Sequence, residues 1–438
     1  MKGLIIALIL TALTTAGTMN LDYTAAKKLL FENNRDILIA AQGVIDAEGK
    51  LTDASSGYLP KISLYGSYNY ISSVPAMQIS LPVGPSVINK TIQTGQNDNW
   101  VFRAALSQVL FDWGRMFLAP KTAAKGLETA ELELEQVKAQ ALLNLNQVFY
   151  SVILSKKIVE VNEESLKLAE ENAKLASARL NTGAGSSFDL LRAKVRISSM
   201  KPVVSKSRNI YEMSVQSLKN ILGIMLTEEI NITGELINSQ AGDFGPENTA
   251  LDAALKKALK DRVEIKKSVA RKEIAEASLA LISTGDKPFL TGSLSYNYQN
   301  PYYTQLSWVD SWNAGLVLSI PVFDGFSTAG KSRSAEAAVK STEITKIQIE
   351  NLIELEVKQT VLNLNEVSER ILAQSEVVKQ AEEYYKIAEA SYKSGVNTNY
   401  DVMDAHLGLL TAKTAYLQAL YDLALAKASY LKAIGELK

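Results

Sequence analysis

The sequence predicts a mainly α-helical protein in which long coiled-coil hairpins accompany a small group of strands suited to a transmembrane β-barrel. Three observations predict this fold class: the chain is internally duplicated, four segments alternate with a period of two, and two long segments repeat apolar residues at coiled-coil spacing. The 438 residues are 47% hydrophobic and 21% charged, which is ordinary for a globular protein. A net charge of -1 gives no indication of a nucleic-acid partner.

The duplication is visible in short matching stretches. Ser-Tyr-Asn-Tyr at 67–70 recurs at 295–298, an offset of 228, and Phe111-Asp112 recurs as Phe323-Asp324, an offset of 212. The second offset is kept by three later pairs, namely Gly183 and Gly395, Asp189 and Asp401, and Gly223 and Gly435. A register that holds over such a length predicts two copies of one structural unit.

The drop from 228 to 212 places 16 extra residues in the first copy, between Tyr70 and Phe111. Residues 74–99, which include prolines and glycines, lie in this interval. A length difference confined to one connection predicts a surface loop there.

The N-terminus has the pattern of a secretory signal peptide. Lys2 precedes an apolar run at 3–13 and small residues at 14–17, which predicts cleavage near Ala16. The alternative, a membrane anchor, needs about 20 apolar residues and this run is shorter. With no cysteine in the chain, neither a disulfide framework nor N-terminal lipidation is available. We therefore expect a signal peptide at 1–16, a first repeat at 17–224, a connector at 225–248 and a second repeat at 249–438.

Each repeat is expected to contain a helix, two strands and a helical hairpin. Period-two alternation predicts strands at about 61–73, 99–111, 288–299 and 309–322. Strands of about 9–11 residues with one apolar face are also those of transmembrane β-barrels. Aromatic residues near the loop ends of these strands are expected to mark a membrane interface: Tyr68, Tyr70, Trp100, Tyr296, Tyr298, Trp308 and Trp312. An ordinary soluble sandwich is the alternative, because it shows the same alternation.

The rest of each repeat reads as helical hairpins at about 115–223 and 327–436. Apolar residues step by three and four, as in a coiled-coil seam, and the polar interruptions Asn162 and Gln374 recur at the 212-residue offset. A helix over 115–181 would be about 100 Å long, and Pro120 predicts either a kink or a late start. Gly183 and Gly395 are expected to end the two long helices.

The strand count itself predicts an oligomer if the strands cross a membrane. Four strands cannot close a barrel, and an open sheet edge is not tolerated in lipid. Two copies would supply eight strands and three copies twelve, so closure alone does not choose the number.

Several motifs resemble those of the TolC-type outer-membrane efflux proteins, and the resemblance covers most of the mature chain. The residues that carry it are Leu21-Asp22-Tyr23, Asn33-Asn34-Arg35-Asp36, Leu59-Pro60, Phe111-Asp112-Trp113-Gly114-Arg115, Gly183-x5-Asp189 and Tyr392-x2-Gly395-x5-Asp401-x2-Asp404. The resemblance implies a homotrimer with a twelve-stranded outer-membrane barrel, four strands per protomer, continued by a periplasmic α-barrel of about a dozen helices.

The resemblance also implies a function. Such proteins are passive ducts that export small molecules, closed at the periplasmic tip and opened by an inner-membrane pump and a periplasmic adaptor protein. Matching the tip motifs places the constriction at Asp189, Tyr392, Asp401 and Asp404, and the adaptor contacts at Gly183, Gly395 and Asn397. Asn397 departs from the basic residue that the family often has there, which puts in question the usual locking contact at the tip.

The chemistry of the tip aspartates allows two interpretations. Rings of carboxylates favour cations and raise one another's pKa. Asp189 and Asp401 also fall at helix starts, where a carboxylate accepts backbone N–H bonds, whereas Asp404 lies a turn further in and is the better pore candidate. Because Tyr392 corresponds to Leu180 and Asp404 to Arg192, the second hairpin is expected to carry most of the closure.

No catalytic motif is present, so we expect no enzymatic activity, no cofactor and no metal site. His406, the one histidine, has no second histidine or cysteine to complete a metal site. Two other functions remain open: a channel dedicated to type I protein secretion, and a non-conducting trimeric coiled-coil stalk or adhesin.

Overall fold

The computed structural model describes residues 19–93, 95–236, 251–302, 305 and 307–437. The predicted signal peptide at 1–16 lies outside the described residues, as does the second half of the predicted connector at 225–248. The chain divides into two compact units, each built from both repeats. One comprises Met1–Gln42, Glu131–Lys267 and Ile347–Lys438, and the other comprises Gly43–Ala130 and Ser268–Lys346.

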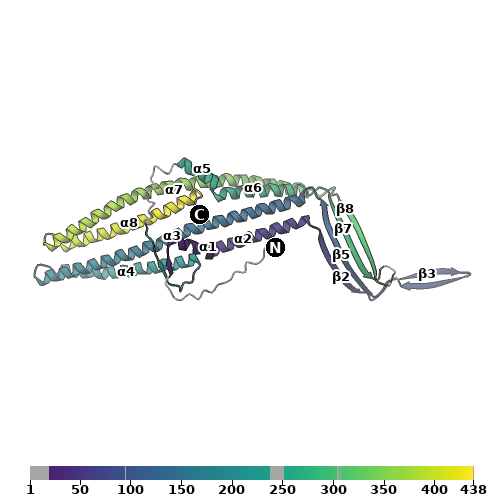
Figure 1. The fold of residues 1–438 in the computed structure, drawn as a ribbon, viewed down its shortest axis with the longest axis horizontal. Helices are drawn as coiled ribbons and strands as arrows, with labels where there is room; N and C mark the ends of the chain where they lie inside the picture. Colours follow the sequence, from purple (N-terminus) through teal and green to yellow (C-terminus); the bar gives the residue numbers. More distant parts are fainter. Residues whose placement is uncertain (1–18, 94, 237–250, 303–304, 306, 438) are drawn as a thin grey trace. The chain divides into compact units, whose positions relative to one another are not determined.

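The first unit is mainly helical and contains most of two long antiparallel hairpins, whose long helices begin in the second unit (Figure 1). The first hairpin joins α3 (Arg115–Asn181) to α4 (Ser187–Leu222), and the second joins α7 (Ser327–Lys393) to α8 (Asn399–Ala433). Both long helices have 67 residues. α3 begins at Arg115 and continues through Pro120, so it does not start late.

The predicted seams are buried within this unit. In the first hairpin, buried seam residues include Leu145, Val152, Ala169, Ala173 and Ala176. In the second, they include Ile353, Val357, Leu364, Ala388 and Tyr392. Burial of one stripe per helix is what the three-and-four spacing predicted, and that prediction is confirmed.

A larger hydrophobic core packs the first hairpin against the N-terminal elements of the chain. Here α1 (Tyr23–Asn33) and the parallel pair of β1 (Met19–Leu21) and β6 (Ile230–Ile232) pack against α3 and α4. Leu21, Phe149 and Leu218 are almost wholly buried there. In the second repeat, α5 (Leu251–Asp261) packs in the corresponding way against α7 and α8.

Each repeat opens with two helices rather than the single helix expected. In the first, α1 gives way to α2 (Arg35–Ser55) at Asn34, whose side-chain oxygen accepts from the backbone N–H of Ile37 at 3.2 Å. In the second, α5 gives way to α6 (Val263–Ile282) at Arg262. Asn34 and Arg262 stand at the offset of 228, so the helix break is itself part of the repeat.

At both helix breaks a side chain forms a hydrogen bond with the C-terminal end of the second helix of the same repeat's hairpin. The Asn34 side chain donates to the carbonyl of Ile221 at 2.9 Å, and Arg262 donates to the carbonyl of Ala433 at 3.3 Å. Ile221 and Ala433 are 212 residues apart, so the same tie is made in both repeats with different side chains.

The second unit contains an antiparallel sheet with strand order β2-β5-β7-β8 (Figure 1). The strands are β2 (Lys61–Tyr70), β5 (Asp98–Phe111), β7 (Phe289–Asn300) and β8 (Val309–Ser319). Two come from each repeat, as predicted. A short 3-10 helix, Ser56–Tyr58, leads into β2.

Three details of this unit differ from the sequence-based expectation. The strand expected at 309–322 ends at Ser319, because Pro321 follows and has no N–H to donate to a ladder. The strand expected to reach 73 ends at Tyr70, and the surface loop expected at 74–99 is a second two-stranded sheet. Its strands are β3 (Ala76–Val83) and β4 (Ser86–Gln93), joined at Gly84, whose φ of 65° suits the first central position of a tight hairpin turn.

Candidate functional site

The four-stranded sheet has one apolar and one polar face. Cross-strand partners such as Leu64 and Ala104, or Tyr296 and Trp312, lie on the same face because the ladder is antiparallel. The apolar face carries Ile62, Leu64, Tyr68, Trp100, Phe102, Leu106, Leu294, Tyr296, Tyr298, Trp312, Leu316 and Leu318. The other face is largely polar and carries Ser63, Ser67, Asn69, Asn99, Arg103, Ser107, Ser293, Ser295, Asn297, Ser311 and Asn313, together with the less polar Tyr65, Val101, Val109, Val309 and Val317.

The apolar face is open to the surroundings of the protomer. Leu64 is 85% exposed, and Trp312 and Leu316 are each 71% exposed. The polar face is cross-linked by its own side chains, since Arg103 donates to the amide oxygen of Asn297 at 2.7 Å. A sheet of this kind requires an apolar medium or a partner on one side and tolerates water on the other.

Aromatic rings cluster at the loop ends of the strands. Tyr68 lies 4.5 Å from Trp100, and Tyr298 lies 4.7 Å from Trp308, measured between ring centroids. Phe102 connects the two pairs, at 6.4 Å from Trp100 and 6.0 Å from Trp308. Four of the seven predicted interface aromatics therefore join one cluster, and Phe102 is a member that the sequence did not single out.

The tips of the two hairpins are built by the same backbone motif. Gly183 and Gly395 have φ values of 76° and 83°, in the left-handed region that favours glycine. The N–H of Ala184 bonds to the carbonyl of Arg179 at 2.9 Å, and the N–H of Val396 bonds to the carbonyl of Ser391 at 2.9 Å. These are the long-range bonds of a Schellman motif, so the prediction that both glycines end the long helices is confirmed.

Asp401 is held at the start of α8. Thr398 caps this helix, and its backbone N–H and hydroxyl both bond to the Asp401 carboxylate, at 2.8 and 2.7 Å. These bonds lower the pKa of Asp401 below its ordinary value. The capping interpretation of Asp401 is therefore confirmed, in the form of a capping box.

The other two tip aspartates are placed differently. Ser186, rather than Asp189, caps α4, and Asp189 sits in the first turn, where its charge suits the helix dipole. Asp404 is exposed on α8, one turn beyond Asp401. Among the described residues, no hydrogen bond or ion pair joins these three aspartates within one protomer.

Tyr392 is buried beneath Arg179. The Tyr392 side chain is 3% exposed and packs with Ala388, Val402 and Ala405. Arg179, in the last turn of α3, donates to the backbone carbonyl of Tyr392 and, at 3.3 Å, to that of Ala184. Its guanidinium carbon lies 4.8 Å from the centre of the Tyr392 ring. One arginine of the first hairpin thereby holds the end of the second.

Two further contacts join the hairpins near their tips. Asn399, which is fully buried, donates to the side-chain oxygen of Asn172 on α3 at 3.1 Å. Arg192 on α4 lies 5.5 Å from the ring of Tyr400 on α8. Sequence reasoning missed Arg179 and Asn399. The repeat offers one signal for Arg179, because its counterpart at the 212-residue offset is Ser391 and so the two hairpins differ at this position.

His406 is buried between the hairpins a short way from the tips. Its ring nitrogen Nε2 lies 2.8 Å from the hydroxyl of Ser165 on α3. Burial lowers the pKa of His406 to about 4, and the positive charges of Arg196 and Lys413 add to this effect. The neutral imidazole is thus part of the hairpin packing.

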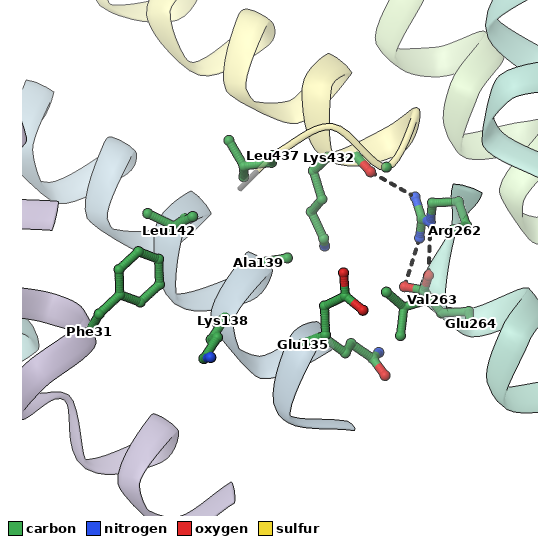
Figure 2. A pocket seen from close by; sticks show the side chains of 12 residues that line it. Phe31, Glu135, Lys138, Ala139, Leu142, Arg262, Val263, Glu264, Lys432 and Leu437 are labelled. Atoms are coloured by element: carbon green, nitrogen blue, oxygen red, sulfur yellow. Dashed lines mark hydrogen bonds and ion pairs between the residues drawn. The ribbon is translucent and has the colours of Figure 1, made fainter. Parts of the chain in front are cut away.

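A pocket of about 190 Å³ lies in the helical unit where the two repeats meet (Figure 2). Figure 2 shows Arg262 at one side of it, bonded to Glu264. Arg262 is only 6% exposed and also pairs with Glu356 at 2.8 Å. The rest of the lining is mixed and includes the apolar Phe31, Leu142 and Val263 and the charged Glu135, Lys138 and Lys432. Arg262 is bonded to the carboxylates of Glu264 and Glu356 and to the carbonyl of Ala433 at the end of α8. We therefore interpret the residues around this pocket as a structural contact between the two repeats.

Among the described helices, none combines the length and the apolarity that crossing a bilayer requires.

Comparison with known proteins agrees with this architecture. A curated relative, the toluene efflux pump outer membrane protein TtgC of Pseudomonas putida, is 20% identical over 407 residues, covering 92% of this chain and 80% of the relative. The outer membrane protein TolC of Vibrio cholerae is 22% identical over 416 residues, covering 93% of this chain and 89% of the relative. The crystal structure of the CmeC outer membrane channel of Campylobacter jejuni superposes with a TM-score of 0.76 at 16% identity, covering 94% of this chain and 85% of that one.

The family model for outer membrane efflux proteins matches residues 27–224 and 254–436. The two matched segments correspond to the two repeats and together span most of the chain. Each includes strands of the amphipathic sheet and one complete hairpin with its tip. The chain belongs to the outer membrane efflux protein family.

Proposed function

We propose that this outer-membrane protein is the channel component of a tripartite export system, a passive trimeric duct for small molecules such as drugs. The observation that carries the proposal is the four-stranded sheet with one apolar face, one polar face and two edges, β2 and β8, that pair with no further strand among the described residues. Lipid tolerates no open edge, so each edge must pair with a neighbouring chain. Three copies would supply twelve strands, with the apolar faces toward lipid and the polar faces toward a water-filled lumen.

The hairpin tips are the proposed gate of this duct. Asp189, Asp401 and Asp404 would provide nine carboxylates in a trimer, which favour the passage of cations over anions. Arg179 takes the place of the basic residue missing at Asn397, because it reaches from the first hairpin to Tyr392 on the second. The turns at Gly183, Gly395 and Asn397 are the proposed contact for a periplasmic adaptor, with an inner-membrane pump supplying the energy.

Conductance of the purified oligomer in planar bilayers tests the proposal. We expect small, cation-selective single channels, and a higher conductance with weaker cation selectivity after Asp404→Ala. Asp404 is the informative position because Asp401 also caps α8, so that its replacement disturbs the helix as well. Asp53→Ala, which removes an exposed aspartate of α2, is the matched control.

Two outcomes would contradict parts of this proposal. An oligomer that never conducts, even with Asp401 and Asp404 both replaced by alanine, would favour the non-conducting stalk. A conducting oligomer whose conductance and selectivity are the same in the Asp404→Ala and Asp53→Ala variants would leave the duct standing but reject the assigned gate.

A further inference from the structure

The hairpin of β3 and β4 is an amphipathic sheet of its own. Cross-strand pairing places Met77 opposite Ile92 and Leu81 opposite Ile88. The face that contains these pairs carries six apolar side chains, Met77, Ile79, Leu81, Val83, Ile88 and Ile92, together with Lys90, which lies opposite Ile79, and Ser86. The opposite face is polar, and on it the Ser80 hydroxyl donates to the side-chain oxygen of Asn89 at 2.6 Å.

Within the protomer this apolar face is uncovered. Among the described strands, β3 and β4 pair only with each other, and Figure 1 shows β3 projecting beyond the loop ends of the four-stranded sheet. Met77 is 57% exposed and Ile88 is 54% exposed. An isolated two-stranded hairpin is marginally stable in water, so a regular ladder of eight pairs implies that another surface covers the apolar side.

The position of the hairpin argues against lipid as that surface. It starts at Ala76, beyond Tyr70 and the aromatic cluster that marks the membrane interface in the proposed orientation. Eight residues of strand extend about 26 Å farther. Neither strand contains an aromatic residue, whereas tyrosine and tryptophan are enriched where proteins meet the membrane surface.

A second copy of the same hairpin is the surface that fits. The hairpin connects β2 to β5, and β2 is an edge strand that must pair with the neighbouring chain in the proposed oligomer. Three-fold symmetry therefore brings three identical hairpins around one axis. Lys90, the only charged side chain of the two strands, lies on the apolar face opposite Ile79, so the collar must let its long aliphatic stem carry the ammonium group out to the rim of the interface.

We infer that the three β3–β4 hairpins of the trimer pack their apolar faces against one another and form a collar outside the membrane. This inference rests on the proposed trimeric channel. It adds an interface that only the first repeat supplies, because the second repeat has no counterpart of β3 and β4 among its described residues.

Single-cysteine cross-linking tests the collar directly, since the natural chain has no cysteine. Leu81→Cys places a thiol on the apolar face, and the matched control Ser80→Cys places one on the polar face of the same strand. After mild oxidation we expect disulfide-linked dimers for Leu81→Cys, in a yield that does not change on dilution, and at least fivefold less for Ser80→Cys. Light scattering of both variants in detergent measures the oligomeric state independently.

The outcomes separate the collar from the channel. Trimers in which Leu81→Cys forms no more dimer than Ser80→Cys would overturn the collar and leave the proposed channel intact. Monomers in detergent would overturn both. A fluorophore attached to the introduced thiol of the Leu81→Cys variant should be shielded from water in the trimer and not quenched by brominated lipids. Quenching by those lipids would overturn the collar and assign the apolar face to the membrane surface.

Discussion

Arg179 and Tyr392 join the two hairpins of a single chain, through a hydrogen bond from the guanidinium to the Tyr392 carbonyl and a ring contact of 4.8 Å. The two residues lie in the last turns of α3 and α7, immediately before the Schellman turns at Gly183 and Gly395. Because the contact is made by a carbonyl and a ring face, it leaves the Tyr392 hydroxyl without a partner among the described residues of the protomer. Any movement of the second tip away from the first must break it.

Replacing Arg179 should therefore loosen the tip. A hydrogen bond with a charged partner is worth about 1.5–3 kcal/mol, so Arg179→Ala should raise the weight of the open state about tenfold or more. Arg179→Lys keeps the charge but loses the planar guanidinium group. Its open probability should therefore lie between those of the natural protein and of Arg179→Ala. Single-channel open probability measures the effect.

Arg208→Ala, which removes an exposed ion pair with Glu163 inside the first hairpin, is the control. Equal open probabilities for the two alanine variants would reject Arg179 as a lock.

The sequence predicted the regular parts of this structure because their signals are local. Period-two alternation located all four strands of the main sheet, and three-and-four spacing located the buried seams. Gly183 and Gly395 ended the long helices where a left-handed residue was required. These features depend on a few neighbouring residues, so one chain is enough to reveal them.

The same reasoning failed where partners lie far apart in the sequence. Arg179 and Tyr392 are separated by 213 positions and meet only because the two hairpins pack side by side at their tips. The β3–β4 hairpin was a different kind of miss. Its alternation of Met77, Ile79 and Leu81 was local and readable, but the length difference between the repeats favoured a loop, and that prediction was wrong.

Protonation of His406 should destabilise the hairpin bundle at acidic pH. Its pKa is about 4 in the folded chain and 6.5 in an exposed state, so the unfolded chain binds the additional proton between these values. Stability is therefore complete above about pH 6.5 and falls as the pH drops toward 4, by about 3 kcal/mol per protomer. The groups that face the imidazole are Ser165 and Glu164 on α3, Arg196 on α4, Tyr385 on α7 and Lys413 on α8.

His406→Gln is the variant that isolates this effect. Glutamine can still bond to the Ser165 hydroxyl but does not titrate in this range. The difference in thermal midpoint between pH 7 and pH 5 should be smaller in the variant than in the natural protein. An identical difference in both would show that other groups cause the acid sensitivity.

Gly223 should tolerate alanine less well than Gly183 does. Both have left-handed φ values, 69° and 76°, which cost alanine about 1–2 kcal/mol. A Cβ at Gly223 would also lie 2.5 Å from the carbonyl oxygen of Asn33, whereas at Gly183 no atom of the described residues lies within 4 Å. Overpacking adds about 1–3 kcal/mol, so Gly223→Ala should lower the thermal midpoint clearly more than Gly183→Ala. Equal shifts would mean that α1 and α4 separate at little cost.

Arg262 makes the strongest prediction about stability, because it is buried between two carboxylates. Arg262→Met removes the cation from Glu264 and Glu356 and also unties the carbonyl of Ala433. Breaking a buried ion pair from one side costs about 3–5 kcal/mol, since a charge is left without its partner. Neutralising the abandoned carboxylates in Arg262→Met/Glu264→Gln/Glu356→Gln should recover a large part of that loss, as measured by thermal unfolding.

Acid titration separates charge from packing at this junction. Burial by itself raises the pKa of Glu264, but the hydrogen bond and charge of Arg262 outweigh it and leave the pKa below 4.5. The Glu264 carboxylate therefore contributes stability above about pH 4.5 that is lost as the pH falls through its lower folded value. In Arg262→Met this contribution should reverse in sign, because burial then dominates and the protonated acid is favoured. The single variant should thus become relatively more stable on acidification from pH 7 to pH 5, which the triple variant should not. If both respond alike, the arginine acts at this junction through packing and its bond to α8 rather than through its charge.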